Sequence, residues 1–407
     1  MIENERQAGV LPFIMLRGND MKKIKVMTVF GTRPEAIKMA PVVLELQKHP
    51  NEIIPIVAVT AQHRDMLDQV LHLFKIKPDY DLNIMAAGQT LFDITTKAMN
   101  GLDKVLSKEK PDIVLVHGDT TTTFAGALAA YYHETTVGHV EAGLRTFNKY
   151  SPFPEEMNRK LTGAIADLHF APTSTASGNL TAENIDPDKV FITGNTVIDA
   201  LHQTVDDGFS FGDEKLENID YKNKRIILVT THRRENLGEP MRHVYKALKD
   251  IVEEFPDVEI VFPVHKNPKV REVVNAELGH VPGVHLIDPL DYEPFANLMH
   301  RAYLVLTDSG GIQEEAPSLG KPVLVLRDTT ERPEAVKAGT VKLIGTQRQR
   351  VYDETKYLLT DEAEYHRMAN TCNPYGDGKA SQRIVQAILW HYGLAAEKPD
   401  SFVAGNE

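Results

Sequence analysis

Carboxylates stand after apolar runs in the first half of the chain, where they could act on a bound ligand. Asp119 comes after the run Ile113–Val116, and Glu141 follows Thr136–Val140. Glu155 opens a helical pattern behind a proline-bracketed loop. Carboxylates grouped in one cleft can act as general acid and general base, because each shifts the pKa of its neighbours.

These carboxylates also have ordinary structural explanations. Asp119 could cap the helix that follows it. Glu155 lies four residues before Arg159, the spacing of a helix ion pair worth ~0.3–0.5 kcal/mol. Glu141 is harder to explain, because a glutamate at the end of a buried strand has little structural purpose without a ligand. For the other two residues the sequence leaves both readings open.

Cations and a glycine turn indicate an anionic ligand. Arg33 and Lys38 lie near the start of a predicted helix, where positive charge opposes the helix dipole unless an anion binds. As solvated surface cations they would need no ligand. The turn Ser309-Gly310-Gly311 lies between an apolar run and a helix, so its backbone N–H groups suit a diphosphate. Glu315, one turn into that helix, could accept hydrogen bonds from ribose hydroxyls.

Histidines follow two apolar runs of the second half. His232 and His265 each stand beside cations, which suits an anion, although a solvated surface histidine is the commoner case. The sixteen histidines show no His-Glu-x-x-His spacing and Cys372 is the single cysteine, so the sequence predicts no metal site. A Gly-x-Gly-x-x-Gly fingerprint is also missing, which leaves a dinucleotide cofactor unsupported. We expect no cofactor.

Parallel sheets must position these residues. Short β-rich apolar runs alternate with helical patterns, an order typical of parallel sheets covered on both faces. The predicted strands are Ile24–Phe30, Ile54–Val59, Ile113–Val116, Thr136–Val140, Leu168–Ala171, Val190–Thr193, Arg225–Thr230, Val258–Val264, Val284–Ile287, Tyr303–Leu306, Pro322–Leu326 and Val341–Ile344. Two such series predict an α/β protein with two doubly wound domains, whose strand ends would face one shared cleft.

Composition restricts the class of protein. The 407 residues, 42% hydrophobic and 25% charged, are typical of a globular chain of two to three domains. A net charge of −12 without a basic run argues against nucleic-acid binding. The sequence contains no apolar stretch near the ~20 residues of a membrane helix, and a single cysteine favours the reducing cytoplasm.

Domain boundaries follow from the same pattern. We expect a disordered extension or alternative start over 1–20, a first domain over 21–195, a second domain over 196–376, a C-terminal helical segment over 377–394 and a frayed tail over 395–407. The extension carries acidic residues where a signal peptide needs positive charge. Four-residue spacing of apolar residues predicts a helix over Ala380–Tyr392, and the polar stretch Asp206–Asn223 predicts a surface insertion.

Eight motifs, in order, give the chain a family resemblance. They are Phe30–Lys38, His117–Thr123, His139–Arg145, Pro154–Arg159, His232–Asn236, Asp308–Pro317, Leu326–Glu334 and Asn373–Gly378. Over about residues 22–394 the chain resembles the non-hydrolysing UDP-N-acetylglucosamine 2-epimerases. The resemblance implies the glycosyltransferase-B type of fold, two Rossmann-like domains facing a cleft, with the C-terminal helix returning to the first domain. It also implies a homodimer.

The resemblance further implies a reaction and a set of site residues. The reaction is reversible inversion at C2 between UDP-N-acetylglucosamine and UDP-N-acetylmannosamine, a precursor for cell-surface polysaccharide, through elimination of UDP to 2-acetamidoglucal and re-addition. The implied catalytic residues are Asp119, Glu141, Glu155 and His232, with acid and base not assigned. The implied ligands of phosphate, sugar, ribose or uracil are Arg33, Lys38, Arg159, His232, Phe295, Ser309, Gly310, Gly311, Glu315 and Arg332.

Regulation and neighbouring activities stay open. Some members bind UDP-N-acetylglucosamine at a second, regulatory site, to which Gln62 and His265 correspond here. Asp65 stands where some members have glutamine and Gly88 where some have arginine, which leaves allosteric activation open. The rival functions are a hydrolysing 2-epimerase, a UDP-sugar glycosyltransferase of the same fold and an inactive sugar-nucleotide binder, the last disfavoured by the intact catalytic set.

Overall fold

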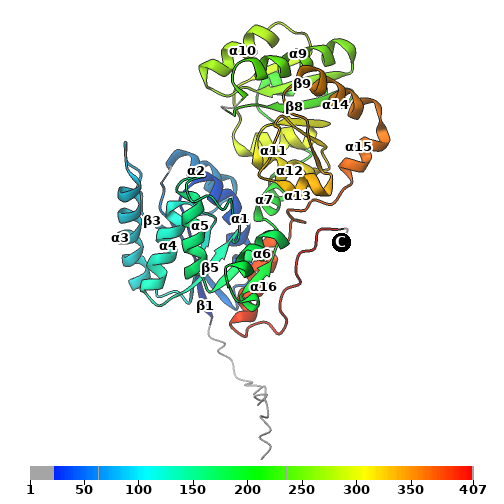
Figure 1. Ribbon diagram of the computed structural model, residues 1–407. Helices are drawn as coiled ribbons and strands as arrows, with labels where there is room; N and C mark the ends of the chain where they lie inside the picture. Colours follow the sequence, from blue (N-terminus) through cyan, green and yellow to red (C-terminus); the bar gives the residue numbers. More distant parts are fainter. Residues whose placement is uncertain (1–22, 63, 234–235, 406–407) are drawn as a thin grey trace, which may run out of the picture.

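The computed structural model describes residues 23–62, 64–233 and 236–405, so the predicted extension over 1–20 lies outside the described residues. The chain forms two lobes, each built on a parallel sheet with helices packed on both faces (Figure 1). This is the predicted α/β class with two Rossmann-like domains.

The first sheet has the strand order β3-β2-β1-β4-β5-β6-β7. Its strands are β1 Ile24–Phe30, β2 Ile53–Val59, β3 Tyr80–Asp81, β4 Ile113–His117, β5 Thr136–Val140, β6 Leu168–Ala171 and β7 Val190–Ile192. The helices along this part of the chain are α1 Arg33–Gln47, α2 Arg64–Leu73, α3 Leu91–Glu109, α4 Thr121–Tyr132, α5 Glu155–Ile165, α6 Ser174–Ala182, the 3-10 turn η1 Pro187–Lys189 and α7 Thr196–Thr204. The order reverses between β1 and β4, where doubly wound sheets bind ligands.

The second sheet repeats this winding with the order β10-β9-β8-β11-β12-β13. Its strands are β8 Arg225–Thr230, β9 Val258–Pro263, β10 Val284–Ile287, β11 Leu304–Thr307, β12 Val323–Val325 and β13 Val341–Leu343. The helices of this part are α8 Glu214–Glu217, α9 Glu239–Glu254, α10 Pro268–Leu278, α11 Tyr292–Arg301, α12 Gly310–Glu315, the 3-10 turn η3 Ala316–Leu319, α13 Pro333–Ala338, α14 Arg348–Thr360 and α15 Glu362–Ala369. The corresponding switch point lies between β8 and β11.

The sequence located the strands well. All twelve predicted runs contain a strand, with bounds that agree to within one or two residues. β3 was missed because only two of its residues pair with β2, too few for a pattern. The predicted insertion over 206–223 is mostly exposed, with the single short helix α8 inside it.

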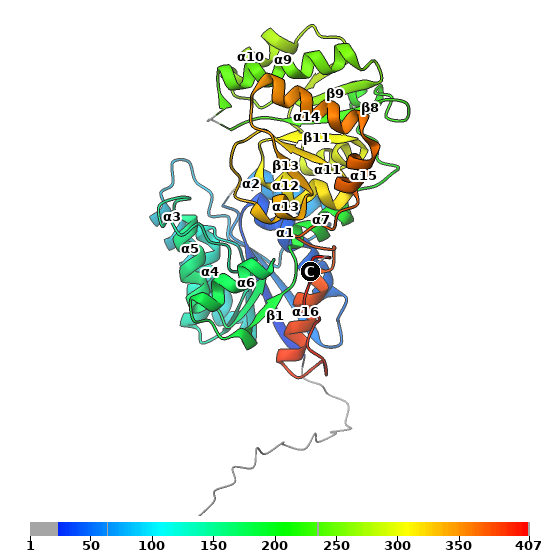
Figure 2. The same cartoon turned by 45° about the vertical axis from the view of Figure 1, so that its right-hand side comes forward.

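The chain passes between the lobes twice. The first passage runs along α7, which begins after Asn195 and buries Ile198 in the core of the first lobe and Leu201 in the core of the second. The second passage, at Tyr375, leads to α16 Ala380–His391, which packs against α1 and α7 (Figure 2). The two passages touch, because the N–H of Asn195 donates to the carbonyl of Tyr375 at 2.7 Å.

The segment after α16 is packed, contrary to the frayed tail expected there. Phe402 is buried, and its N–H donates to the carbonyl of Ile192 at 2.8 Å. The ammonium of Lys398 lies 4.8 Å from the centre of the Phe191 ring. Ring faces attract cations and a buried aromatic side chain anchors the strand edge, so these contacts hold the segment on β7.

Candidate functional site

Lys38 and Glu141 form an ion pair at the carboxyl edge of the first sheet. Lys38 lies in α1 and Glu141 follows β5; their side chains are 18% and 10% exposed. Burial alone would raise the pKa of Glu141, but Lys38 and then His117 outweigh it and hold this pKa well below its usual value. The carboxylate is therefore ionised at neutral pH although it is largely withdrawn from water.

The backbone of Glu141 is left-handed, with φ of 60°. For a residue with a side chain this conformation costs about 1–2 kcal/mol, and such strain is concentrated at functional sites. The turn comes just past β5, and the carboxylate lies against α1 and the end of β4. This geometry supports the interpretation that Glu141 has no purely structural role.

Asp119 does not cap α4, so that alternative is wrong. The cap is Thr120, whose hydroxyl accepts from the N–H of Thr123. The carboxylate of Asp119 instead accepts from Arg159 Nη2 at 2.5 Å, and its carbonyl accepts from the side chain of Asn158. The charged side chain of Asp119 thus lies where α5 meets the end of β4.

Glu155 does not pair with Arg159, so the surface ion-pair alternative is also wrong. Arg159 contacts Asp119 and Glu156 instead. Glu156 is buried and accepts from the backbone N–H groups of Thr146 and Phe147, which fixes the loop before α5. Oε2 of Glu155 is buried and has no hydrogen-bond partner among the described residues. An unsatisfied buried carboxylate oxygen is costly, which indicates a role with a ligand.

The start of α1 is organised by Glu35. Together with Thr32 it forms the predicted capping box, and it also accepts from the hydroxyls of Thr120 and Thr123. One buried carboxylate therefore joins the first turns of α1 and α4. Arg33, two residues before Glu35, is half-buried at the start of α1.

The second lobe contributes its own ion pair, Arg332 with Glu314. Glu314 also accepts from the side chain of Asn195, so it lies at the junction of the lobes. The charge of Glu314 helps raise the pKa of Lys38, after the opposing effect of burial and the larger effect of Glu141. Arg332 likewise interacts with Glu141. The two ion pairs therefore interact with each other where the lobes meet.

The turn before α12 is open, as predicted. Ser309 occupies the N-cap position but its hydroxyl makes no cap hydrogen bond, and a Cβ added at Gly310 would meet nothing within 4 Å. Burial, and next the charge of Glu314, raise the pKa of Glu315 to about 8. Glu315 is thus protonated below that pH. Phe295, in α11, packs against the core of the second lobe.

His232 and His265 lie together at the ends of β8 and β9. Their rings stack with centres 6.2 Å apart, and Nδ1 of His232 lies 3.0 Å from the buried carboxylate of Asp308. Asp308 also accepts from the backbone N–H groups of His232 and Arg233. Gln62, the other predicted regulatory residue, accepts from Thr122 in the first lobe.

Seven of the predicted residues thus form three groups. One is Lys38, Glu141 and Arg332 where the lobes meet, a second is Asp119 with Arg159, and a third is His232 with His265. The residues that sequence reasoning missed are His117, Glu156, Asp308 and Glu314. All four stand inside the quoted motifs, but only the tertiary contacts reveal what they do.

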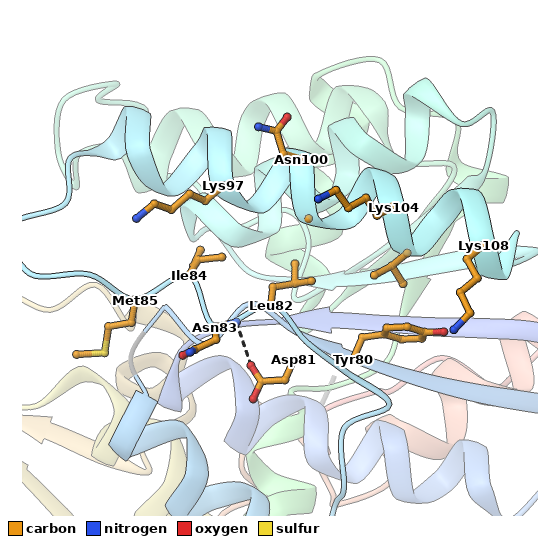
Figure 3. Close-up of a pocket in the computed structure, with 12 residues that line it drawn as sticks. Tyr80, Asp81, Leu82, Asn83, Ile84, Met85, Lys97, Asn100, Lys104 and Lys108 are labelled. Atoms are coloured by element: carbon orange, nitrogen blue, oxygen red, sulfur yellow. Dashed lines mark hydrogen bonds between the residues drawn. The ribbon is translucent and has the colours of Figure 1, made fainter.

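A separate pocket of about 650 Å³ lies between α3 and the segment around β3. Figure 3 shows Lys97, Lys104 and Lys108 extending from α3 above Tyr80 and Leu82. None of the residues grouped above lines it. We therefore give this pocket no part in the site.

Neither a metal-binding cluster nor a membrane-spanning helix is found among the described residues. In residues 23–62, 64–233 and 236–405, no group of three or more His, Cys, Asp or Glu side chains could hold a metal ion. Within the same ranges no helix is long and apolar enough to cross a membrane.

Two Rossmann-like domains with charged groups at facing strand ends define the glycosyltransferase-B class of sugar-nucleotide proteins. The family model of UDP-N-acetylglucosamine 2-epimerases matches residues 44–389. A UDP-N-acetylglucosamine 2-epimerase of Bacillus subtilis is 63% identical over 382 residues, 94% of this chain and 99% of that protein. The chain belongs to the UDP-N-acetylglucosamine 2-epimerase family, and it is an enzyme of that class.

Solved structures agree with this assignment. A crystal structure of a UDP-N-acetylglucosamine 2-epimerase has a TM-score of 0.88 at 60% identity, covering 94% of this chain and all of that one. The enzyme of Neisseria meningitidis, solved bound to UDP-N-acetylglucosamine, has a TM-score of 0.76 at 54% identity and covers 90% of this chain and all of its own.

Proposed function

We propose that the enzyme interconverts UDP-N-acetylglucosamine and UDP-N-acetylmannosamine without net hydrolysis. The observation that carries this proposal is the pair of cations, Lys38 and Arg332, that approach Glu141 from opposite lobes. Such an arrangement can hold a diphosphate between the lobes while an ionised carboxylate stands beside the sugar.

The chemistry accounts for the residues. The proton on C2 is not adjacent to a carbonyl and is only weakly acidic. When the C1–O bond breaks, UDP leaves with the electron pair and positive charge develops at C1, which acidifies the C2 proton. A carboxylate takes that proton in an anti elimination, and 2-acetamidoglucal forms. Syn re-addition of UDP at C1 and of a proton at C2, on the opposite face, then gives the other epimer.

We assign roles to the site residues on this basis. Asp119, Glu141 and Glu155 are the proton-transferring and charge-stabilising carboxylates, and His232 completes the catalytic set. Substrate would be held by Arg33, Lys38, Arg159, Ser309, Gly310, Gly311 and Arg332 at phosphates or sugar, by Glu315 at ribose and by Phe295 near uracil. The unpartnered Oε2 of Glu155 supports a catalytic use of that residue.

Retention of UDP distinguishes this proposal from hydrolysis. A glycal recaptured by UDP yields a nucleotide sugar, whereas water entering the cleft yields free N-acetylmannosamine. We further propose that the product supplies cell-surface polysaccharide, and that the enzyme works in the cytoplasm, in keeping with its single cysteine.

We also propose a homodimer that uses the outer face of the first lobe. There α4 packs between α3 and α5, and the exposed side chains Phe92, Tyr131, Tyr132 and Leu161 lie on these three helices. Large exposed apolar groups on neighbouring elements mark protein interfaces. Gln62 and His265 remain our candidates for a regulatory contact.

Incubation with UDP-N-acetylglucosamine in deuterated water tests the function. Proton NMR should show UDP-N-acetylmannosamine carrying deuterium at C2, with little free sugar. Free N-acetylmannosamine and UDP as the main products would indicate the hydrolysing reaction. Unlabelled epimer would rule out the elimination route, and turnover only with an added acceptor would indicate a glycosyltransferase.

A further inference from the structure

Glu141 has a second neighbour besides Lys38. His117, the last residue of β4, lies with Nε2 3.4 Å from Oε2 of Glu141, and its side chain is 4% exposed. Neither ring nitrogen of His117 has a hydrogen-bond partner among the described residues. A buried histidine whose ring nitrogens make no hydrogen bond is unusual, and among the described residues the ion pair with Glu141 is the only one found for His117.

The contact follows from the sheet. His117 pairs in register with Val140, and the left-handed turn at Glu141 comes directly after that pair. The carbonyl of His117 also accepts from the hydroxyl of Thr123, which ties the end of β4 to α4. The imidazole is therefore placed by rigid elements and not by a loop.

Both neighbours of Glu141 contact the same oxygen. Lys38 and His117 approach Oε2, and none of the hydrogen bonds found within the described residues uses Oε1. A carboxylate held by one oxygen presents the other in a fixed direction. The distance of 3.4 Å is long for a hydrogen bond, but such contacts often shorten when substrate binds.

We propose that His117 is a positioning residue that aims Oε1 of Glu141 at the C2 proton, an inference that rests on the proposed function. Lys38 cannot do this alone, because it also serves the diphosphate and divides its hydrogen bonds between the two anions. Within the described residues His117 makes no other ion pair, so it holds Oε2 in place throughout the reaction. His117 acts through Glu141 and does not itself touch the sugar.

The variants His117→Ala and His117→Gln test the proposal, with His169→Ala as control. His169 is an equally buried histidine of the same sheet, on β6, without a contact to Glu141. A misplaced reacting group can cost about 10²-fold in rate. We expect His117→Ala to lower kcat about 10²-fold with KM and the Kd of UDP unchanged. Gln carries an N–H donor at a similar reach, so His117→Gln should restore most of kcat. His169→Ala should keep kcat.

A double variant tests whether His117 acts through the carboxylate. In the Glu141→Gln background, adding His117→Ala should cost less than about tenfold, because the group that it positions is already gone. Independent losses that multiply would overturn the proposal, as would a His117→Gln variant that folds but stays as slow as His117→Ala. If the wild-type enzyme makes no epimer at all, the proposed function has failed instead.

Discussion

Replacing Glu141 by Gln removes the negative charge of the side chain and leaves its shape nearly unchanged. Gln keeps the size and one acceptor oxygen but cannot take a proton. General acid–base catalysis contributes about 10²–10⁴-fold, so kcat should fall by that factor, which corresponds to about 3–5 kcal/mol of transition-state stabilisation.

The same change has a smaller effect on folding. Breaking a fully buried ion pair costs about 3–5 kcal/mol. The Lys38 side chain is 18% exposed and can still donate to the amide oxygen of Gln. We therefore expect the free energy of unfolding to fall by about 1–2 kcal/mol. For lobes of this size that lowers the melting temperature by about 2–8 °C. The folded fraction at assay temperature should stay near one.

The assay combines three measurements and a matched control. Epimer formation by NMR gives kcat, calorimetry gives the affinity for UDP, and thermal unfolding gives stability. Glu183→Gln is the control, because it removes a carboxylate that pairs with the buried Arg145 of the same lobe instead of with Lys38, and it should lower stability without lowering kcat. Near-normal turnover of Glu141→Gln, or an equal loss of UDP binding and rate, would refute the site assignment.

Three further predictions concern other parts of the molecule. Asp199→Ala should lower the free energy of unfolding by about 1–3 kcal/mol, since Asp199 accepts from the N–H groups of Ala380 and Ser381 at the start of α16; an unchanged denaturant midpoint would contradict this. Glu315→Gln should remove a pH dependence of the free energy of unfolding. The pKa of Glu315 in the folded enzyme, about 8, lies above the ordinary 4.5, so the stabilisation is complete below pH 4.5 and is lost as the pH rises from 4.5 to 8. Wild type should therefore lose stability relative to the variant over this range. Parallel curves would show that Glu315 titrates normally. Tyr132→Glu should give monomers in sedimentation if the outer face of the first lobe forms the dimer; dimers of this variant would place the interface elsewhere.

Long-range contacts explain what the sequence could not predict. The strands were predictable because continuous apolar runs such as Ile113–Val116 are local signals, and so was the capping box at Thr32 and Glu35. The partner of Arg159 could not be predicted. The four-residue spacing between Glu155 and Arg159 is a local pattern, but Arg159 contacts Asp119, which lies 40 residues away in the sequence. The role of His117 likewise depends on the register between β4 and β5, which no single segment encodes.

The two adjacent passages between the lobes have a mechanical consequence. A single tether would let one lobe tumble freely, but paired tethers joined by the hydrogen bond from Asn195 to Tyr375 resist twisting and sliding. The motion that remains is a hinge rotation of the two lobes about the line through the two passages. Each closing motion should therefore bring Arg332 back along the same arc towards Lys38. The two lobes then meet in the same alignment in every turnover.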